Sequence, residues 1–294
     1  MNIKTQEISM PILKDKGVTL SIKRIDQNHK HISGNKLYKL KYNLLEAKRL
    51  NLHTVLTFGG AYSNHIAATA CLAKESKFKS IGIIRGEEYF PLNYTLKFAE
   101  KQGMEIHYLN RNKYKSKHTD SVIFELRQKF GDFYLIPEGG SNSLAIRGTS
   151  EIIDSNDVQD FICCPVGTGA TIAGIISSTK HHQQVIGFPA IKGFRQLERD
   201  IAYWSNRSNW KLINDYVCGG YAKINIDLIT TIETFYKIYN TPLDAIYTGK
   251  MMYGILDLVS KDYFPRGCSI LAIHTGGIQG NKGMAQRLGI KLPS

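Results

Sequence analysis

The chain has 294 residues, of which 43% are hydrophobic and 21% are charged. This composition is that of an ordinary globular protein with one or two domains and enough apolar residues for a sizeable core. The formal net charge is +13, but most lysines are spread along the chain and no nucleic-acid-binding motif accompanies them. We therefore expect a basic, solvated surface and no nucleic-acid partner.

The cysteines and the N-terminal residues indicate the cellular compartment of the protein. The five cysteines have no metal-ligand spacing; they are Cys71, Cys163, Cys164, Cys218 and Cys268. Their number is odd and the first ten residues are too polar for a signal peptide. We therefore expect reduced thiols, a cytoplasmic location and no metal site. No apolar run reaches membrane-spanning length, so no membrane partner is expected either.

Strands and helices alternate along nearly the whole chain, which predicts an α/β fold with parallel sheets. In the first half, we expect strands at residues 18–25, 55–58, 80–84, 105–109 and 133–136. Helices are expected there at 38–50, 66–74, 93–101 and 121–130. A basic cluster lies between the strand expected at 105–109 and the helix expected at 121–130, where a solvated loop is expected. It comprises Arg111, Lys113, Lys115 and Lys117.

The second half continues the alternation. Strands are expected at 161–166, 185–191 and 270–274. Helices are expected at 145–154, after the glycine-rich turn at 167–174 as far as about 180, at 196–205, 226–239 and 251–261, and at the C-terminus. We predict two open parallel-sheet domains with flanking helices. Residues 47–145 would form a small α/β domain, and residues 1–46 and 146–294 a discontinuous large domain. A ligand would bind in the cleft between them.

Lys36 stands out because it follows Gly34 and Asn35 at the start of a predicted amphipathic helix. Apolar residues recur along that helix at helical spacing, at Leu40, Leu44, Ala47 and Leu50. Burial and the positive end of a helix both lower a lysine's pKa, and the neutral amine can then attack a carbonyl. The alternative is an ordinary solvated lysine, which is the commoner case.

A glycine-rich segment at 167–174 follows an apolar strand and opens a helix. Backbone N–H groups in such a turn can bind a phosphate, and Thr168 and Thr171 would add hydroxyl donors. The segment lacks the sequence of a P-loop and the spacing of a dinucleotide-binding turn. A simple tight turn is the alternative.

Four further positions complete a possible site. Ser63, before Asn64, either caps a helix or binds a substrate carboxylate. Tyr221 and Tyr247 lie in predicted loops, and Thr275 ends an apolar strand, where α/β folds place ligand groups. A lysine, a phosphate cradle and a hydroxyl at a strand end together fit one cofactor, pyridoxal 5'-phosphate.

These motifs resemble the fold-type II pyridoxal-phosphate enzymes of the tryptophan synthase β superfamily. More narrowly, they are similar to the 1-aminocyclopropane-1-carboxylate (ACC) deaminase / D-cysteine desulfhydrase family. The resemblance covers nearly the whole chain. It is carried by Lys23-Arg24 with Asp26, Ser33-Gly34-Asn35-Lys36, Tyr62-Ser63-Asn64-His65, the segments 137–142 and 167–174, Tyr247-Thr248-Gly249-Lys250 and His274-Thr275-Gly276-Gly277.

The resemblance implies a role for each of these positions. Lys36 would be the Schiff-base lysine and the base for the α-proton. Asn64 would bond the cofactor's phenolic oxygen, and Thr275 its ring nitrogen. The phosphate loop would comprise Gly167, Thr168, Gly169, Ala170 and Thr171. The substrate side would comprise Ser63, which contacts the carboxylate, and Asn64, His65, Tyr221, Tyr247 and Thr248.

The resemblance also narrows the reaction. ACC deaminases carry glutamate at position 248 and leucine at 275, whereas threonine at both positions resembles the D-cysteine desulfhydrase branch. Tyr38 stands where many relatives have arginine. We expect a homodimeric lyase that eliminates sulfide from a small amino acid, giving pyruvate and ammonia. The alternatives are ACC deamination to 2-oxobutanoate, β-elimination from related amino acids of either hand, and a non-catalytic pyridoxal-phosphate-binding protein.

Overall fold

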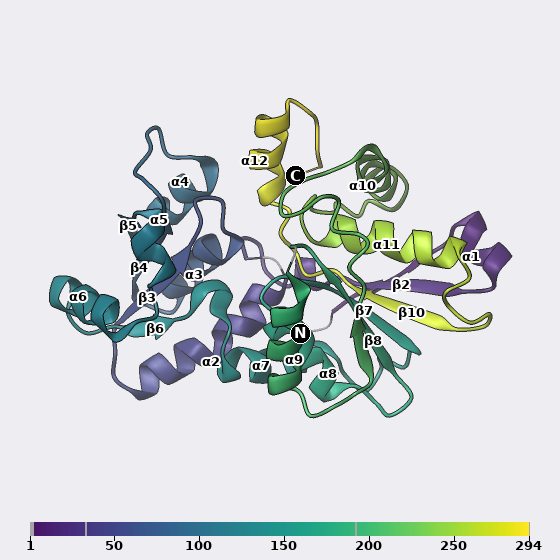
Figure 1. Ribbon diagram of the computed structural model, residues 1–294, viewed down its shortest axis with the longest axis horizontal. Coiled ribbons are helices and arrows are strands. Elements are labelled where there is room, and N and C mark those ends of the chain that lie inside the picture. Colours follow the sequence, from purple (N-terminus) through teal and green to yellow (C-terminus); the bar gives the residue numbers. More distant parts are fainter. Residues whose placement is uncertain (1–2, 33, 192, 294) are drawn as a thin grey trace.

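The computed structural model describes residues 3–32, 34–191 and 193–293. Two separate sheets lie side by side, each flanked by helices, with the smaller sheet on the left of Figure 1 and the larger on the right. The predicted α/β class with two parallel-sheet units is thereby confirmed. Ser33, which belongs to the predicted lysine motif, lies outside the described residues.

The larger sheet has six strands in the order β1-β2-β10-β7-β8-β9. Their bounds are β1 (Thr5–Ile8), β2 (Thr19–Lys23), β10 (Ser269–Ile273), β7 (Phe161–Val166), β8 (Gln184–Pro189) and β9 (Trp210–Leu212). All neighbours are parallel except β1, which pairs antiparallel with β2. The sequence analysis missed β1 and β9, because these short edge strands carry no buried apolar run.

The smaller sheet has four parallel strands in the order β5-β4-β3-β6. They are β5 (Met104–Leu109), β4 (Lys79–Arg85), β3 (Thr54–Gly59) and β6 (Tyr134–Ile136). All four lie within residues 47–145, the range predicted for the small domain. The domain boundaries themselves stay a prediction.

Helices cover both faces of the larger sheet, as its apolar strands require. Along β7, Cys163 packs toward the helices α10 (Ile226–Tyr239) and α11 (Thr248–Ser260). Its neighbours Ile162 and Cys164 pack toward α8 (Ala170–Ser178) and α9 (Phe194–Trp204). Alternate residues of one strand therefore fill two separate cores.

Helix α2 (Asn35–Arg49) carries the predicted lysine at its first turn. Leu40, Leu44 and Ala47 are buried, as the apolar stripe predicts. Leu50 departs from the prediction: it lies just past the helix end and is 45% exposed. The remaining helices are α1 (Pro11–Lys16), α3 (Asn64–Glu75), α4 (Tyr94–Lys101), α6 (Asp120–Phe130), α7 (Ser143–Thr149) and α12 (Gly280–Leu288).

The basic cluster at 111–117 is not the solvated loop that the sequence predicts. It begins with a short helix, α5 (Arg111–Lys115), whose Tyr114 is buried. Lys113 pairs with Glu125, and Lys117 lies 3.1 Å from Glu138. Much of the local charge is thus neutralised within the chain. Across the described ranges, no helix has both the length and the apolar character to cross a membrane.

Candidate active site

The first turn of α2 is packed directly against the segment that follows β10. Gly34 has a φ of 81°, and a Cβ there would lie 1.9 Å from the carbonyl oxygen of Thr275. The backbone N–H of Asn35 donates to that same oxygen at 3.2 Å. Only glycine tolerates both this conformation and this approach. The contact therefore fixes Lys36, the next residue, beside the end of β10.

Asn35 connects three of the predicted site residues, two through its side chain and one through its backbone. Its amide nitrogen donates to the Thr171 hydroxyl at 2.8 Å, and its Oδ1 accepts from Lys36 Nζ at 2.9 Å. The backbone of the same residue bonds Thr275. The structure thus brings together Lys36, Thr171 and Thr275, which come from three distant parts of the chain. This role of Asn35 was not predicted from the sequence, where it is only the residue before Lys36.

The environment of Lys36 favours the neutral amine. Burial lowers the pKa of Lys36 from 10.5 to about 8, and the nearby carboxylate of Asp244 opposes the shift. At pH 7 roughly a tenth of an amine with this pKa is neutral, whereas less than about one in a thousand molecules of an ordinary surface lysine is. The predicted chemistry of Lys36 therefore has a physical basis.

A second lysine, Lys39, lies one turn further along α2 and was missed by the sequence analysis. It is 2% exposed, and its Nζ donates to the hydroxyls of Ser141 and Thr168 at 3.0 and 3.3 Å. Burial and the charge of Lys36 hold the pKa of Lys39 well below its usual value. Its neutral hydroxyl partners do not balance a positive charge at this buried position, so a bound anion would stabilise the protonated form of Lys39. The spacing from Lys36 was its only signal in the sequence.

The glycine-rich segment adjoins this cation. Gly169, with a φ of 88°, precedes α8, whose first N–H groups point away from the helix. Thr168 bridges Lys39 and Ser141, and a Cβ on Gly139 would contact Thr168 at 3.0 Å. Residues 167–171 and the segment 137–142 thus enclose one position with Lys39. A helix N-terminus, hydroxyls and a buried lysine together suit a phosphate group.

Ser63 and Asn64 open α3. The Ser63 hydroxyl oxygen accepts from His65 N and Ile66 N at 3.2 and 3.4 Å, so it caps the helix. Its proton can still be donated to a ligand. Asn64 Oδ1 is buried without a hydrogen-bond partner among the described residues. A Cβ on Gly277 would lie 3.1 Å from Asn64 Nδ2, so this amide adjoins the segment after Thr275.

His65 is buried against the smaller sheet. Its Nε2 lies 2.7 Å from the hydroxyl of Thr57, which itself donates to the carbonyl of Ile136. Thr57 therefore accepts from Nε2–H, which leaves Nδ1 as an acceptor with no partner in the described chain. Burial keeps the pKa of His65 well below its usual value, with Lys36 and Lys39 adding to the effect. A direct contact of His65 with substrate stays a prediction.

Tyr221 and Tyr247 are brought together, with their rings edge to face at a centroid distance of 6.5 Å. A Cβ on Gly167 would lie 3.2 Å from the Tyr247 ring, which places that ring over the start of the glycine-rich segment. Asp244 fixes the turn by accepting from Ile246 N and Tyr247 N, both at 2.9 Å.

Thr248 lies in the same turn, but its hydroxyl is already occupied. It donates to Asp244 Oδ1 at 2.7 Å and accepts from Asp244 N at 2.9 Å, and the residue is fully buried. These contacts make Thr248 part of the turn that orients Tyr247. Its predicted contact with substrate stays a prediction.

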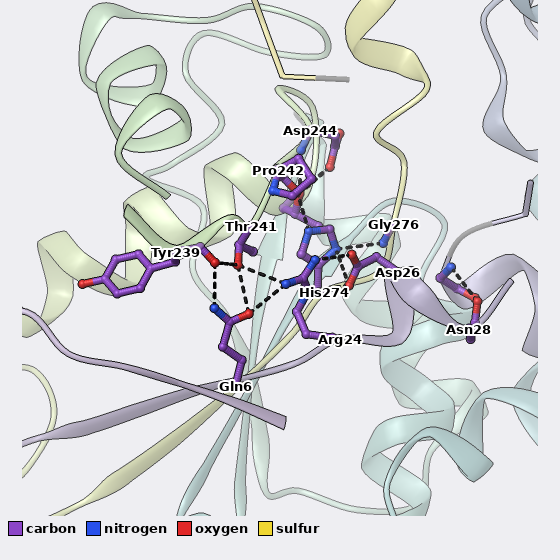
Figure 2. A network of polar contacts seen from close by, with 12 residues as sticks. Gln6, Arg24, Asp26, Asn28, Tyr239, Thr241, Pro242, Asp244, His274 and Gly276 are labelled. Atoms are coloured by element: carbon purple, nitrogen blue, oxygen red, sulfur yellow. Dashed lines mark hydrogen bonds and ion pairs between the residues drawn. The ribbon is translucent and has the colours of Figure 1, made fainter. Parts of the chain in front are cut away.

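A buried polar network joins Arg24, Asp26 and His274, the residue before Thr275 (Figure 2). Arg24 makes a two-point ion pair with Asp26 at 2.9 and 2.8 Å, and also donates to Gln6 and Thr241. His274 accepts from Gly276 N at Nδ1, so its Nε2 donates to the carbonyl of Pro242 at 2.7 Å. The network thus holds the residues on both sides of Thr275.

Residues 3–276 match the profile of the pyridoxal-phosphate-dependent enzymes. The chain belongs to this family. It is 31% identical to a provisionally named ACC deaminase of Thermotoga maritima, covering 92% of this chain and 93% of the relative. It is 30% identical to the mitochondrial bifunctional D-cysteine desulfhydrase/ACC deaminase of Arabidopsis thaliana, covering 90% of this chain and 73% of the relative.

A solved structure of an ACC deaminase homologue shows the same fold. It superposes with a TM-score of 0.85 at 25% identity, covering 98% of this chain and 93% of that one. The predicted fold-type II architecture, the membership of the family and the cofactor class are therefore confirmed. The residues described above fit pyridoxal phosphate: Lys36 offers the amine, and Lys39 with residues 167–171 offers an anion site.

The pH dependence of cofactor capture tests the pKa of Lys36. Only the neutral amine reacts with the cofactor's aldehyde, so the capture rate of the apoprotein should rise with pH and level off above about 8. An ordinary lysine would continue to gain neutral amine up to pH 10.5. Stopped-flow absorbance after mixing apoprotein with pyridoxal phosphate measures this rate. A rate that still rises tenfold per pH unit between pH 9 and 10 would contradict the account.

Proposed function

We propose that the protein is a lyase that eliminates sulfide from a small amino acid, with D-cysteine as the principal substrate. In the net reaction, cysteine and water give pyruvate, ammonia and hydrogen sulfide. The observation that carries the proposal is Thr275, whose backbone is bonded to the turn that holds Lys36. A neutral hydroxyl at the ring nitrogen would not enforce a protonated ring, as a carboxylate would. Such a site suits substrates with a good leaving group at the β-carbon.

The proposed division of labour follows the geometry. Pyridoxal phosphate, when bound, supplies the aldehyde and a ring that draws electron density from the substrate's α-carbon. Lys36 Nζ takes the α-proton, and the electron pair left on the α-carbon then displaces the β-sulfur as thiolate. Ser63 donates a hydrogen bond from its hydroxyl group to the substrate carboxylate. Tyr221 and Tyr247 flank the substrate on the side opposite Ser63.

The cofactor would be held at three points. Lys39, Thr168 and the first turn of α8 bind the phosphate, together with Gly167, Gly169, Ala170 and Thr171. Asn64 would bond the phenolic oxygen by donating from its amide N–H group, as the family resemblance implies. Thr275 meets the ring nitrogen.

ACC deamination is the second candidate, supported by the names of the relatives. The turn at Thr248 argues against it in this chain. A glutamate at that position, as the deaminase pattern has, would place a second carboxylate beside buried Asp244. The chain instead uses a small hydroxyl there.

Location and assembly are further proposals. All five cysteines are free, and four of them are buried; this pattern supports a reducing compartment such as the cytoplasm. We also propose a homodimer.

A substrate panel tests the proposed function. The holoenzyme should release pyruvate from D-cysteine or β-chloro-D-alanine and little or no 2-oxobutanoate from ACC. L-cysteine and both serines complete the panel, and Lys36→Ala supplies the blank. Keto-acid products are separated and quantified by chromatography. Robust ACC deamination without thiol elimination would favour the second candidate. A cofactor-bound protein that turns over no member of the panel would contradict an enzymatic role on small amino acids.

Ser63→Asp separates the capping role of Ser63 from its proposed substrate role. Aspartate caps helices as well as serine does, so the melting temperature should change little. It cannot donate a proton and it repels a carboxylate, so the KM should rise at least about tenfold. Asn110→Asp, the same kind of cap exchange at α5, is the matched control and should leave KM unchanged. An unchanged KM in Ser63→Asp would remove Ser63 from the substrate site.

A further inference from the structure

Lys250 is a buried lysine with no assigned role. It is 1% exposed and lies in the first turn of α11, where the helix end is already partially positive. Burial lowers the pKa of Lys250, although Asp244 and Cys218 oppose the shift. A lysine in such a place is unfavourable unless its ammonium group makes strong hydrogen bonds.

Its hydrogen bonds go to one short loop. Lys250 Nζ donates to the carbonyl oxygens of Val217 and Gly220, both at 2.8 Å. We call residues 217–222 the Tyr221 loop, because Tyr221 lies inside it. The two carbonyls are also the ends of a backbone turn, since Gly220 N donates to Val217 O at 2.9 Å. One ammonium group thus clamps the loop where it reverses direction.

The Tyr221 loop needs such a clamp. Four of its residues have positive φ: Cys218 at 50°, Gly219 at 86°, Gly220 at 134° and Ala222 at 55°. For cysteine and alanine this conformation is strained, and strain of this kind persists only where surrounding contacts enforce it. Further contacts lie at the end of the loop, where Arg287 donates to the carbonyl of Ala222 and Ala222 is buried in the core.

The clamp also connects the loop to the second tyrosine. Lys250 lies three residues after Tyr247, so the two side chains leave the same turn of α11. Tyr221 is 52% exposed, and the edge-to-face contact with Tyr247 is its ring contact in the described chain. The hydrogen bonds from Lys250 thus reach the loop that carries Tyr221, and the side chain of Tyr221 contacts Tyr247 directly.

We propose that Lys250 is a positioning residue that holds Tyr221 against Tyr247 by fixing the Tyr221 loop. The proposal rests on the proposed function only for the part that concerns turnover. Loop order is a property of the chain itself and can be measured without a substrate.

Lys250→Met tests the proposal because methionine keeps the apolar stem and removes the donors. Hydrogen–deuterium exchange of the holoenzyme should accelerate in residues 217–222 and remain unchanged in the strands of both sheets. The value of kcat/KM should fall about 10- to 100-fold, as expected when a contact residue shifts by about 1 Å. Lys261→Met, on the exposed end of the same helix, is the control and should change neither quantity.

A double variant shows whether Lys250 acts through Tyr221. If it does, adding Lys250→Met to Tyr221→Phe should cost little beyond the single Tyr221→Phe change. Independent, multiplying losses would contradict the proposal, and so would unchanged exchange in the Tyr221 loop. Failure of both Lys250→Met and Lys250→Gln to fold would also contradict it, because Lys250 would then support the whole core. If the wild type turns over no substrate, the exchange result still decides the loop role while the proposed function fails separately.

Discussion

The site depends on one contact, in which the first turn of α2 packs against the carbonyl group of Thr275. Gly34 permits the approach, and Asn35 then bonds the end of β10 through its backbone and Thr171 through its side chain. Because three distant segments meet at two residues, Lys36 has little freedom in where its amine lies. The network of Arg24, Asp26 and His274 holds His274 and Gly276, the residues on both sides of Thr275 (Figure 2).

Three buried lysines differ in how their charge is balanced, and the difference separates lysines that stabilise the fold from a lysine that can bind a ligand. Lys23 pairs with the carboxylates of Asp154 and Asp157, and Lys250 donates to two backbone carbonyls. Both are compensated within the protein. Lys39 has hydroxyl partners instead, and so its charge is available to a ligand. The buried lysine with the weakest internal compensation thus lies beside the glycine-rich segment, where a phosphate would bind.

The sequence predicted most of the fold because apolar runs and glycine turns mark buried strands and their ends. The strand at 161–166 and the helix at 226–239 have the predicted bounds. Strand β1 was not predicted because three of its four residues are not buried. Its pairing with β2 depends on the tertiary structure and has no local signal in the sequence. Lys39 and Lys250 escaped because burial of a lysine depends on neighbours far away in the chain. Thr248 shows the converse case. It belongs to a motif that predicts substrate contact, but its hydroxyl makes hydrogen bonds with Asp244 within the turn.

The central claim is that Lys36, not its buried neighbour Lys39, carries the cofactor. Borohydride reduction of the holoenzyme, followed by proteolysis and mass spectrometry, tests it directly. The account predicts a single peptide with the reduced pyridoxyl-phosphate mass, and fragmentation that places the mass on Lys36. The mass should be absent in Lys36→Ala and present in Lys39→Met. A modification on Lys39, or an unmodified Lys36 in protein that has bound the cofactor, would contradict the account.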